Sequence, residues 1–484
     1  MFRSARCPHL GLSALLLITG CSMVPEYQRP ASALPQGFKE APGWRPAAPA
    51  DDRPRSEWWT WLGDTELDAL QARVLVSNQN LAAAMAAYDQ ARAATDEQRA
   101  ALFPRLNLQG SATRAGSFGS DTAVIAGGAG GGAANSGSFN SSRRYSASLG
   151  ASWEVDVFGR LRASASQAGA LAQASAADLA NATLAARGEL ALNYVQLRAT
   201  DAQADLLDKA ITGFLRALDI ANNRYAAGVV GRVDVLQAET QLRSARADAA
   251  DLARQRAALE HAIAVLVGES PSTFALAKTA WAPQVPVVPA VLPSELLERR
   301  PDIASAERRV AAANAAVGIE RAAYFPTLNL TGSAGFTSSS VASLFDIASS
   351  VWSLGATGLM TLLDFGARSA RVDQARAAYE QTVAEYRQTV LVAFQETEDQ
   401  LSAVRILEQV EEQRAAATTA ADEAEQITLN QYVAGVVSYS DVILAQATAL
   451  DARQASVTAT LNRQAAAISL IRAIGGYWDG ELSS

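Results

Sequence analysis

The chain contains an internal duplication, and no other feature of the sequence restricts its fold as strongly. Residues 103–112 recur as residues 325–334, and residues 225–235 recur as residues 432–442. Two matches in the same order indicate that one structural unit occurs twice, so we expect a fold built from two similar halves. The first copy is 15 residues longer between the two matches, and the glycine- and serine-rich stretch 116–142 lies where the extra residues must be. Its composition predicts a mobile loop.

Each copy has the same predicted order of elements. A helical segment, at residues 67–102 in the first copy and 294–324 in the second, leads to a strand, a loop and a second strand. A long helix, a tight turn and a returning helix follow. The sequence therefore predicts an α+β fold that is present twice.

The long helices are the largest predicted elements. They occupy the glycine-bounded intervals 159–228 and 366–435, neither of which contains proline. At about 1.5 Å rise per residue, an unbroken helix of this size is roughly 100 Å long. Gly188 and Gly213 are positions at which the first helix could bend. Helices of this length are not buried in a globular domain, and their alanine-rich composition favours close lateral packing in a coiled-coil-like wall.

The predicted strands have two different faces. Apolar side chains alternate with small or polar ones along residues 145–155 and again along residues 352–362. Alternation with period two is typical of a β-strand whose faces meet different surroundings. The alternating positions are Tyr145, Ala147, Leu149, Ala151, Trp153 and Val155 in the first copy, and Trp352, Leu354, Ala356, Gly358, Met360 and Leu362 in the second.

Four amphipathic strands of about ten residues match the length that crosses a bilayer when tilted. Four strands cannot close a barrel, and an open sheet in lipid leaves backbone groups unpaired at several kcal/mol each. Two chains would supply eight strands, whose interior is filled by side chains, whereas three chains supply twelve and leave an aqueous lumen. We therefore expect a homotrimer, with the long helices in the periplasm and the glycine-rich loop outside.

The N-terminus has the pattern of a secretory signal. Basic residues precede an apolar run, residues 10–18, that is too short for a permanent membrane span. The sequence Ile18-Thr19-Gly20-Cys21 resembles a bacterial lipobox, which predicts cleavage before Cys21 and acylation of this cysteine with chains such as palmitate. Several acyl chains make a stable anchor, at about 0.8 kcal/mol for each buried CH₂. Cys7 leaves with the signal, so an intramolecular disulfide is excluded.

Charge and hydropathy exclude two other classes of protein. The formal net charge is −8 and the pI is about 5.1, which argues against a nucleic-acid partner. No stretch after the signal has 18 consecutive apolar residues, which argues against a helical membrane span. A membrane crossing would have to use strands.

Two short segments resemble catalytic or cofactor-binding motifs but lack the surrounding elements that such motifs require. Residues 364–366 spell the kinase magnesium motif Asp-Phe-Gly without a His-Arg-Asp loop, and residues 128–133 imitate a dinucleotide fingerprint without its strand and helix. His261 is the single histidine of the mature chain, so neither a triad nor a zinc cluster can form around it. We expect no enzyme activity, no cofactor and no metal site. Three aromatic residues are predicted to pack on the helices rather than bind a ligand: Trp58, Trp59 and Trp61.

Several short motifs follow one another along the chain in a recognisable order. They are Cys21 with Pro25-Glu26-Tyr27, residues 58–64, residues 80–84, and Leu297-Glu298-Arg299-Arg300-Pro301-Asp302-Ile303 followed by Ala306-Glu307. Together they resemble the TolC-like outer-membrane factor family, specifically the NodT-type lipoproteins of RND-type tripartite efflux systems. The resemblance covers essentially the whole mature chain. It implies a trimeric twelve-strand β-barrel, a periplasmic α-helical barrel, and docking to a periplasmic adaptor protein and an inner-membrane RND-type pump.

The resemblance also implies a periplasmic gate at the turns between the helices. In the family this end is a constricted aperture held by hydrogen bonds and charge pairs, and the matching positions here are Tyr225, Asp234, Tyr432 and Asp441. Asp234→Ala or Tyr432→Phe is expected to loosen the aperture. Val437 and Leu444 stand where relatives often carry charged residues, so the resemblance implies a weaker charged lock.

A simpler role for the same residues is capping of the helices. Gly228 and Gly435 suit a left-handed helix C-cap. Asp441 follows Ser438 by three residues, a spacing that indicates an N-terminal cap with an acid favoured by the helix dipole. Capping and gating are compatible, and both readings stay open at this point.

We therefore expect an α+β membrane protein that serves as a passive exit duct in the cell outer membrane, lipid-anchored and with a periplasmic extension. It would carry drugs and toxic compounds delivered by the pump through the adaptor. Two alternatives are a type I secretion duct and a non-channel structural coiled-coil lipoprotein; the amphipathic strands disfavour the latter because a spacer does not need them. The expected divisions are a signal peptide (1–20), a lipid-anchored extended segment (21–66), a first repeat (67–290), a second repeat (291–476) and a short tail (477–484).

Overall fold

The computed structural model describes residues 23–31, 37–40, 57–116, 141–286, 288 and 299–476. The predicted signal peptide, Cys21, residues 117–140 of the glycine-rich stretch and the C-terminal tail lie outside the described residues. The chain divides into two compact units. Unit 1 comprises the described parts of residues 1–28, 91–170 and 311–381, and unit 2 those of residues 29–90, 171–310 and 382–484.

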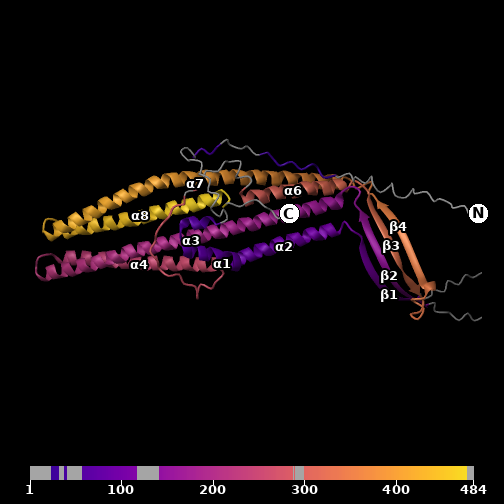
Figure 1. The fold of residues 1–484 in the computed structure, drawn as a ribbon, viewed down its shortest axis with the longest axis horizontal. Coiled ribbons are helices and arrows are strands. Elements are labelled where there is room, and N and C mark those ends of the chain that lie inside the picture. The colour runs from indigo at the N-terminus through magenta and orange to yellow at the C-terminus, as the bar shows by residue number, and fades with distance from the viewer. Residues whose placement is uncertain are drawn as a thin grey trace, which may run out of the picture. The chain divides into compact units, whose positions relative to one another are not determined.

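Unit 1 contains a four-stranded antiparallel sheet in the order β1-β2-β3-β4 (Figure 1). The two strands of each repeat pair with each other, and β2 pairs with β3. One continuous sheet therefore joins the two repeats. The strands are β1 (Arg105–Gly116), β2 (Ser141–Val155), β3 (Thr327–Ser338) and β4 (Ser350–Leu359).

The predicted strand 352–362 is wrong at its C-terminal end. β4 stops at Leu359, which pairs with Thr327, so Met360 and Leu362 lie beyond the ladder. Thr327 is the first residue of β3 and follows Pro326, which has no backbone N–H with which to extend the pairing.

The long helices of the two repeats have equal lengths, which confirms the duplication. α3 (Arg160–Ala226) and α7 (Ala367–Val433) contain 67 residues each, and the returning helices α4 (Arg232–Leu266) and α8 (Tyr439–Ala473) contain 35 residues each. The other elements are the 3-10 helices η1 (Trp58–Leu62) and η2 (Ile347–Ser349) and the helices α1 (Thr65–Ser77), α2 (Gln79–Ala100) and α6 (Pro301–Ala322).

The predicted helical segment 67–102 is two helices and not one. Asn78 separates α1 from α2 because its side chain oxygen accepts the N–H groups of Asn80 and Leu81 at 2.9 and 3.1 Å. Asparagine is a strong N-cap residue for this reason. Its amide nitrogen donates to Leu266 O at 2.8 Å, which ties the break to the end of α4.

α3 runs as one continuous helix through Gly188 and Gly213, the two positions named above as sites where it could bend. Gly188 has a packing role instead: a Cβ atom there would lie 2.1 Å from Cδ of Arg472 on α8. Gly213 has no heavy atom within 4 Å of the same position. The first glycine permits close approach of another helix, and the second is surrounded by open space.

The helices of unit 2 pack through small and medium apolar side chains. One buried cluster joins three helices and consists of Leu207 and Phe214 on α3, Leu242 and Ala245 on α4, and Leu450 on α8. Trp58 and Trp59 are buried with edge-to-face rings, and the Arg187 guanidinium lies 4.4 Å from the centre of the Trp59 ring. These contacts agree with the predicted packing role of the two tryptophans. Within the described part of the chain, no helix combines the length and the hydropathy that a membrane crossing requires.

Candidate functional site

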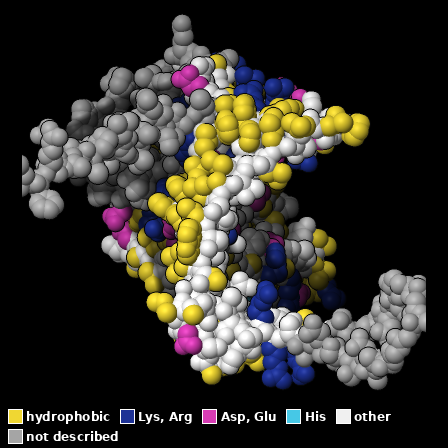
Figure 2. All heavy atoms as spheres, turned by 90° about the vertical axis from the view of Figure 1, so that its right-hand side faces the viewer, with side chains coloured by type: hydrophobic (Ala, Val, Ile, Leu, Met, Phe, Trp, Pro, Cys, Tyr) yellow, Lys and Arg dark blue, Asp and Glu magenta, His cyan; other side chains and the backbone are white. Residues whose placement is uncertain are grey.

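The pairing register places the alternating apolar residues on one face of the sheet. Leu108 of β1 pairs with Leu149 of β2, Leu149 with Ala334 of β3, and Ala334 with Trp352 of β4. Directly paired residues project to the same side, so this apolar row continues across all four strands. Leu108 and Trp352 are 83% and 82% exposed, so no described residue covers this face at these two positions. Figure 2, in which the sheet faces the viewer, shows hydrophobic side chains gathered in a band beside it.

The opposite face of the sheet is small and hydroxylic. Ser111 of β1 and Ser146 of β2 are cross-strand partners whose hydroxyl oxygens lie 2.8 Å apart. Ser333 of β3 and Ser353 of β4 repeat the arrangement at 2.8 Å. The sheet therefore separates an apolar surface from a polar one, with the strands as the boundary.

Both lateral edges of the sheet are open within the chain. β1 pairs only with β2 and β4 only with β3 among the described residues. Each edge strand therefore presents a row of N–H and C=O groups that need partners. Where water is excluded, those partners must come from another strand.

In unit 2, each long helix turns into its returning helix through a glycine in the left-handed conformation. The φ angles are +71° at Gly228 and +80° at Gly435. In both turns the glycine N–H donates to a tyrosine carbonyl, from Gly228 to Tyr225 at 2.9 Å and from Gly435 to Tyr432 at 3.0 Å. The positive φ angles and these bonds confirm the predicted left-handed caps. Glycine suits the position because an L side chain at this φ would be strained.

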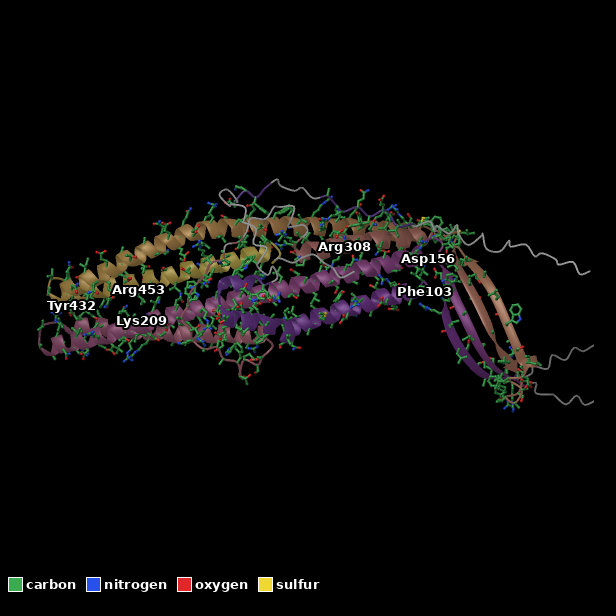
Figure 3. All side chains as sticks on the ribbon, viewed as in Figure 1. Phe103, Asp156, Lys209, Arg308, Tyr432 and Arg453 are labelled. Carbon is green, nitrogen blue, oxygen red and sulfur yellow. The ribbon has the colours of Figure 1, made fainter. Side chains whose placement is uncertain are left out.

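A buried aromatic cluster, here called the tip cluster, lies at these turns. It brings together Ala221 of α3, Ala238 of α4, Tyr432 of α7, and Tyr439 and Val442 of α8. Tyr432 lies at the tip of the α7–α8 hairpin (Figure 3), with its ring centre 5.4 Å from that of Tyr439. The tip cluster therefore holds both helical hairpins of the chain together at their turns.

Two polar features accompany the aromatic rings. The guanidinium of Arg224 lies 4.7 Å from the centre of the Tyr432 ring, a cation–π distance. The Tyr432 hydroxyl is buried and has no hydrogen-bond partner within the described residues. Buried hydroxyl groups normally form a hydrogen bond, so the partner of the Tyr432 hydroxyl is missing from the described residues.

The four predicted gate residues have different surroundings. Tyr432 is in the tip cluster, and Asp234 is close enough to Tyr439 to help raise the pKa of that phenol. Burial is the largest cause, Tyr432 is the next, and with Asp234 they raise the pKa of Tyr439 to about 12. Tyr225 is 47% exposed and is not part of the cluster.

Asp441 is a helix cap in this chain. Its carboxylate accepts the Ser438 N–H at 3.0 Å and the Ser438 hydroxyl at 2.6 Å. These bonds form a capping box and confirm the N-terminal cap that the three-residue spacing predicted. The corresponding N-cap of α4 is Gly231, which has no side chain with which to cap.

Two members of the tip were missed by sequence reasoning. Tyr439 and Arg224 were not singled out because the duplication gives no signal for them: their counterparts in the other repeat are Arg232 and Gln431. The repeat comparison detects what both copies share, whereas this contact uses residues in which the copies differ.

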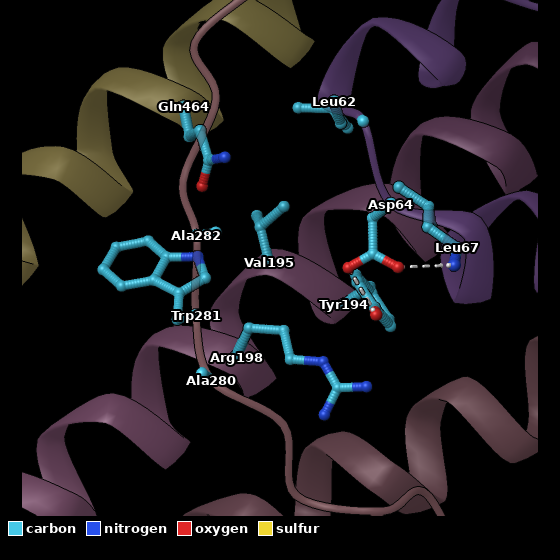
Figure 4. A pocket seen from close by; sticks show the side chains of 11 residues that line it. Leu62, Asp64, Leu67, Tyr194, Val195, Arg198, Ala280, Trp281, Ala282 and Gln464 are labelled. Atoms are coloured by element: carbon cyan, nitrogen blue, oxygen red, sulfur yellow. Dashed lines mark hydrogen bonds between the residues drawn. The ribbon is translucent and has the colours of Figure 1, made fainter.

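A second cluster in unit 2 surrounds a small cavity of about 80 Å³ (Figure 4). The Tyr194 hydroxyl donates to the Asp64 carboxylate at 2.7 Å, and the buried Arg198 guanidinium pairs with Glu66 and Asp201. Burial and the Asp64 bond raise the pKa of Tyr194. Arg256 also reaches Asp201 at 2.7 Å, so every buried charge in this cluster has an opposite charge beside it. The arrangement is that of a structural ion network.

The residues considered as candidates for catalysis have other positions and roles in the structure. Asp364 accepts the N–H groups of Gly366 and Arg368 at 3.3 and 3.1 Å, so the kinase-like triplet is the start of α7. His261 is exposed on α4. Within the described residues, no group of three or more His, Cys, Asp or Glu side chains could hold a metal ion.

The chain is similar to known proteins over nearly its whole length. The model of the family described as outer membrane efflux protein matches residues 70–269 and 292–476. The chain is 31% identical over 482 residues to the outer membrane protein OprJ of Pseudomonas aeruginosa, covering 98% of this chain and 97% of the relative. It is 30% identical over 481 residues to the cation efflux system protein CusC of Escherichia coli, with coverages of 98% and 99%.

Solved structures show the same fold. The open-state MtrE outer membrane channel of Neisseria gonorrhoeae superposes with a TM-score of 0.82 at 27% sequence identity, covering 96% of this chain and 100% of MtrE. The match extends over both repeats and includes long helices together with a sheet of the kind described above. The family, the relatives and the solved structure are all of one kind, outer-membrane proteins.

Proposed function

The chain belongs to the outer membrane efflux protein family, and from this premise we propose that three copies form a passive exit duct through the outer membrane. The observation that carries the proposal is the sheet: one face is apolar, the other is hydroxylic, and both edges are open. Such a sheet suits a wall between lipid and water. It does not suit a coiled-coil spacer, which needs no amphipathic strands.

Closure of the backbone hydrogen bonds supports the trimer. The outer edge of β4 in one chain would pair with the outer edge of β1 in the next, which removes every unpaired edge. With four strands from each chain, two chains would close a barrel filled by its own side chains, and three give one wide enough for an aqueous lumen. The serine-lined face would then surround the lumen, with the apolar face in lipid.

We further propose that acylated Cys21 anchors the chain in the outer membrane. Cys21 lies outside the described residues, but the segment that follows it supports the idea. A Cβ atom on Gly318 of α6 would lie 2.7 Å from Cα of Val24, and the Asn314 amide donates to Pro25 O at 2.8 Å. Val24 and Pro25 are therefore packed on α6 in unit 1, the unit that contains the sheet.

The partners follow from the kind of system to which the relatives belong. CusC is named as part of a cation efflux system, and TtgC of Pseudomonas putida as the outer membrane protein of a toluene efflux pump. We propose that this chain likewise receives small toxic compounds from an inner-membrane pump of the RND type through a periplasmic adaptor. The pump would supply the energy, and the chain itself would have no catalytic activity, no cofactor and no nucleic-acid partner.

The tip cluster is the proposed gate. In a trimer the turns of three chains would converge, and a side chain that lacks a partner in one chain could find one in its neighbour. Tyr432 fits this role because its hydroxyl is buried and unpaired in the described chain, and Asp234 fits it as a half-buried acid beside Tyr439. Asp441 caps α8 and would act on the gate by holding the turn, and Tyr225 is exposed where a neighbouring chain could contact it.

Susceptibility profiling tests the proposed function. Deleting the gene should raise sensitivity to a set of drugs, metals or solvents, and expression of the unaltered chain should restore resistance. A Cys21→Ser variant, which cannot be acylated, should restore less because less protein reaches the outer membrane. Unchanged sensitivity to all compounds, together with a specific loss of one secreted protein, would favour type I secretion instead.

A further inference from the structure

Two arginines face each other directly across the β1–β2 ladder. Arg114 of β1 and Arg143 of β2 are cross-strand partners, and both are exposed. Directly opposed side chains have Cβ atoms about 5 Å apart, and like charges in this position destabilise a sheet. The pair is therefore a local concentration of positive charge that an anion would stabilise.

The arginines project from the apolar face of the sheet. Arg114 is separated by even intervals from Leu106 and Leu108, so period two places the three side chains on one side. Arg144, the next residue along β2, pairs with Thr113 and projects to the hydroxylic side. Arg143 and Arg144 are thus adjacent in sequence but belong to opposite faces.

An aromatic row lies next to the arginines on the same face. Tyr145 pairs with Ala112, and Phe336 pairs with Ala147. The Phe336 ring also meets the Phe345 ring edge-on, with centroids 5.6 Å apart. In outer-membrane barrels, rows of aromatic residues mark the boundary between hydrocarbon and headgroups. A basic residue just beyond such a row, on the lipid side, lies at the level of the lipid headgroups.

Two arginines that follow the other end of β2 are paired with acids, whereas Arg114 and Arg143 are not. Near the start of α3, Arg160 pairs with Glu154 at 2.8 Å and Arg162 with Asp156 at 3.1 Å. Among the described residues, no carboxylate forms an ion pair with Arg114 or Arg143. The guanidinium group binds phosphate through two parallel hydrogen bonds, which makes a phosphate the best-matched anion.

We propose that Arg114 and Arg143 form a binding site for the phosphate groups of an anionic lipid in the outer leaflet. The proposal rests on the proposed function, because it requires the sheet to span the outer membrane with the β1–β2 turn outside. The site would hold charged lipids around the barrel where the two strands emerge. The second repeat contributes no counterpart, because the equivalent cross-strand partners there are the uncharged Phe336 and Ser350.

Native mass spectrometry of the detergent-purified protein tests the site, with lipid A and dephosphorylated lipid A as probes. The unaltered protein should retain lipid A and not the dephosphorylated form. The double variant Arg114→Gln/Arg143→Gln should bind lipid A at least about tenfold more weakly, the loss expected for charge-assisted hydrogen bonds. The control Arg144→Gln removes one positive charge from the other face and should bind lipid A normally.

Three outcomes would overturn the site. They are equal binding of the two lipids, an equal loss in Arg144→Gln, and displacement of lipid A by inorganic phosphate at the same concentration, which would indicate a site for free anions. Conductance of the same samples in planar bilayers separates this proposal from the proposed function. A protein that conducts but does not discriminate between the lipids refutes only the site, whereas a protein that never conducts refutes the duct itself.

Discussion

Tyr432 and Tyr439 pack against each other across the α7–α8 turn, with ring centroids 5.4 Å apart and ring planes inclined by 50°. Each tyrosine comes from a different side of the turn, so the contact closes the hairpin. Ala221 and Ala238 belong to the same cluster and extend it to the α3–α4 hairpin. The tip of the chain is therefore stabilised by packing, and its few charges lie around an aromatic centre.

The pH dependence of stability should contain a contribution from Tyr439. Burial raises the pKa of Tyr439 from 10.0 to about 12 in the folded chain. Above pH 10 the unfolded chain loses this proton while the folded chain retains it, so folding stability should fall between pH 10 and pH 12. Tyr439→Phe should reduce that fall in melting curves. Tyr194, whose pKa is also raised, contributes in the same direction and is present in both proteins. Identical pH profiles for the two proteins would contradict the assignment.

Removing one hydroxyl tests whether Tyr432 acts between chains. Tyr432→Phe deletes a buried group that has no partner in the described chain, so a monomer would lose no hydrogen bond. If a neighbouring chain supplies the partner, the variant should raise single-channel conductance in planar bilayers. Asp234→Ala should do the same by removing an acid from the tip. If neither variant changes the conductance, the tip cluster is a packing element and not a gate.

The buried ion network should be far more sensitive than the exposed pairs. Asp201 is 3% exposed and compensates both Arg198 and Arg256. Asp201→Ala leaves the buried Arg198 and the half-buried Arg256 with less compensation and should destabilise the fold by about 3 kcal/mol, seen as a lower melting temperature. Asp251→Ala, which breaks an exposed pair with Arg254, should leave the melting temperature almost unchanged. Equal changes in melting temperature for the two substitutions would show that the buried network stabilises the fold no more than an exposed pair does.

The N-terminal segment should detach from α6 when a side chain at position 318 fills the space in which Val24 packs. Gly318→Leu places a side chain where Val24 now packs, so cleavage after Glu26 by a glutamate-specific protease should become faster. The helical control is Gly213→Leu, at a glycine with open space around it, which should leave the cleavage rate unchanged. An unaltered rate in Gly318→Leu would mean that the segment is held mainly elsewhere.

The sequence predicted the larger features of the fold because those features are periodic or repeated. Alternation along residues 145–155 predicted β2 and its two faces, and the glycine-bounded intervals predicted α3 and α7 to within two residues at each end. Both signals are local, since each depends on spacing along one segment. The division at Asn78 was missed because the helical pattern continues on both sides of a cap made by one side chain.

The finer contacts could not be predicted because they join segments that are distant in the chain. Nothing in the sequence brings Gly188 to Arg472 or Val24 to Gly318; each glycine only makes a close approach possible. The tip shows the same limit, since Asp234 and Tyr432 were named from a resemblance while Tyr439, their neighbour in space, was not. Register is a further example: the opposition of Arg114 and Arg143 depends on how two strands pair.

Each chain supplies four of the twelve strands that the proposed barrel needs, so one chain alone cannot form the channel. The most direct measurement is the native mass of the detergent-extracted protein, combined with its conductance in planar bilayers. We expect a complex of three chains that forms discrete conducting channels, with conductance rising in Tyr432→Phe. A stable folded monomer that leaves the bilayer impermeable, even with the tip substitutions in place, would contradict it.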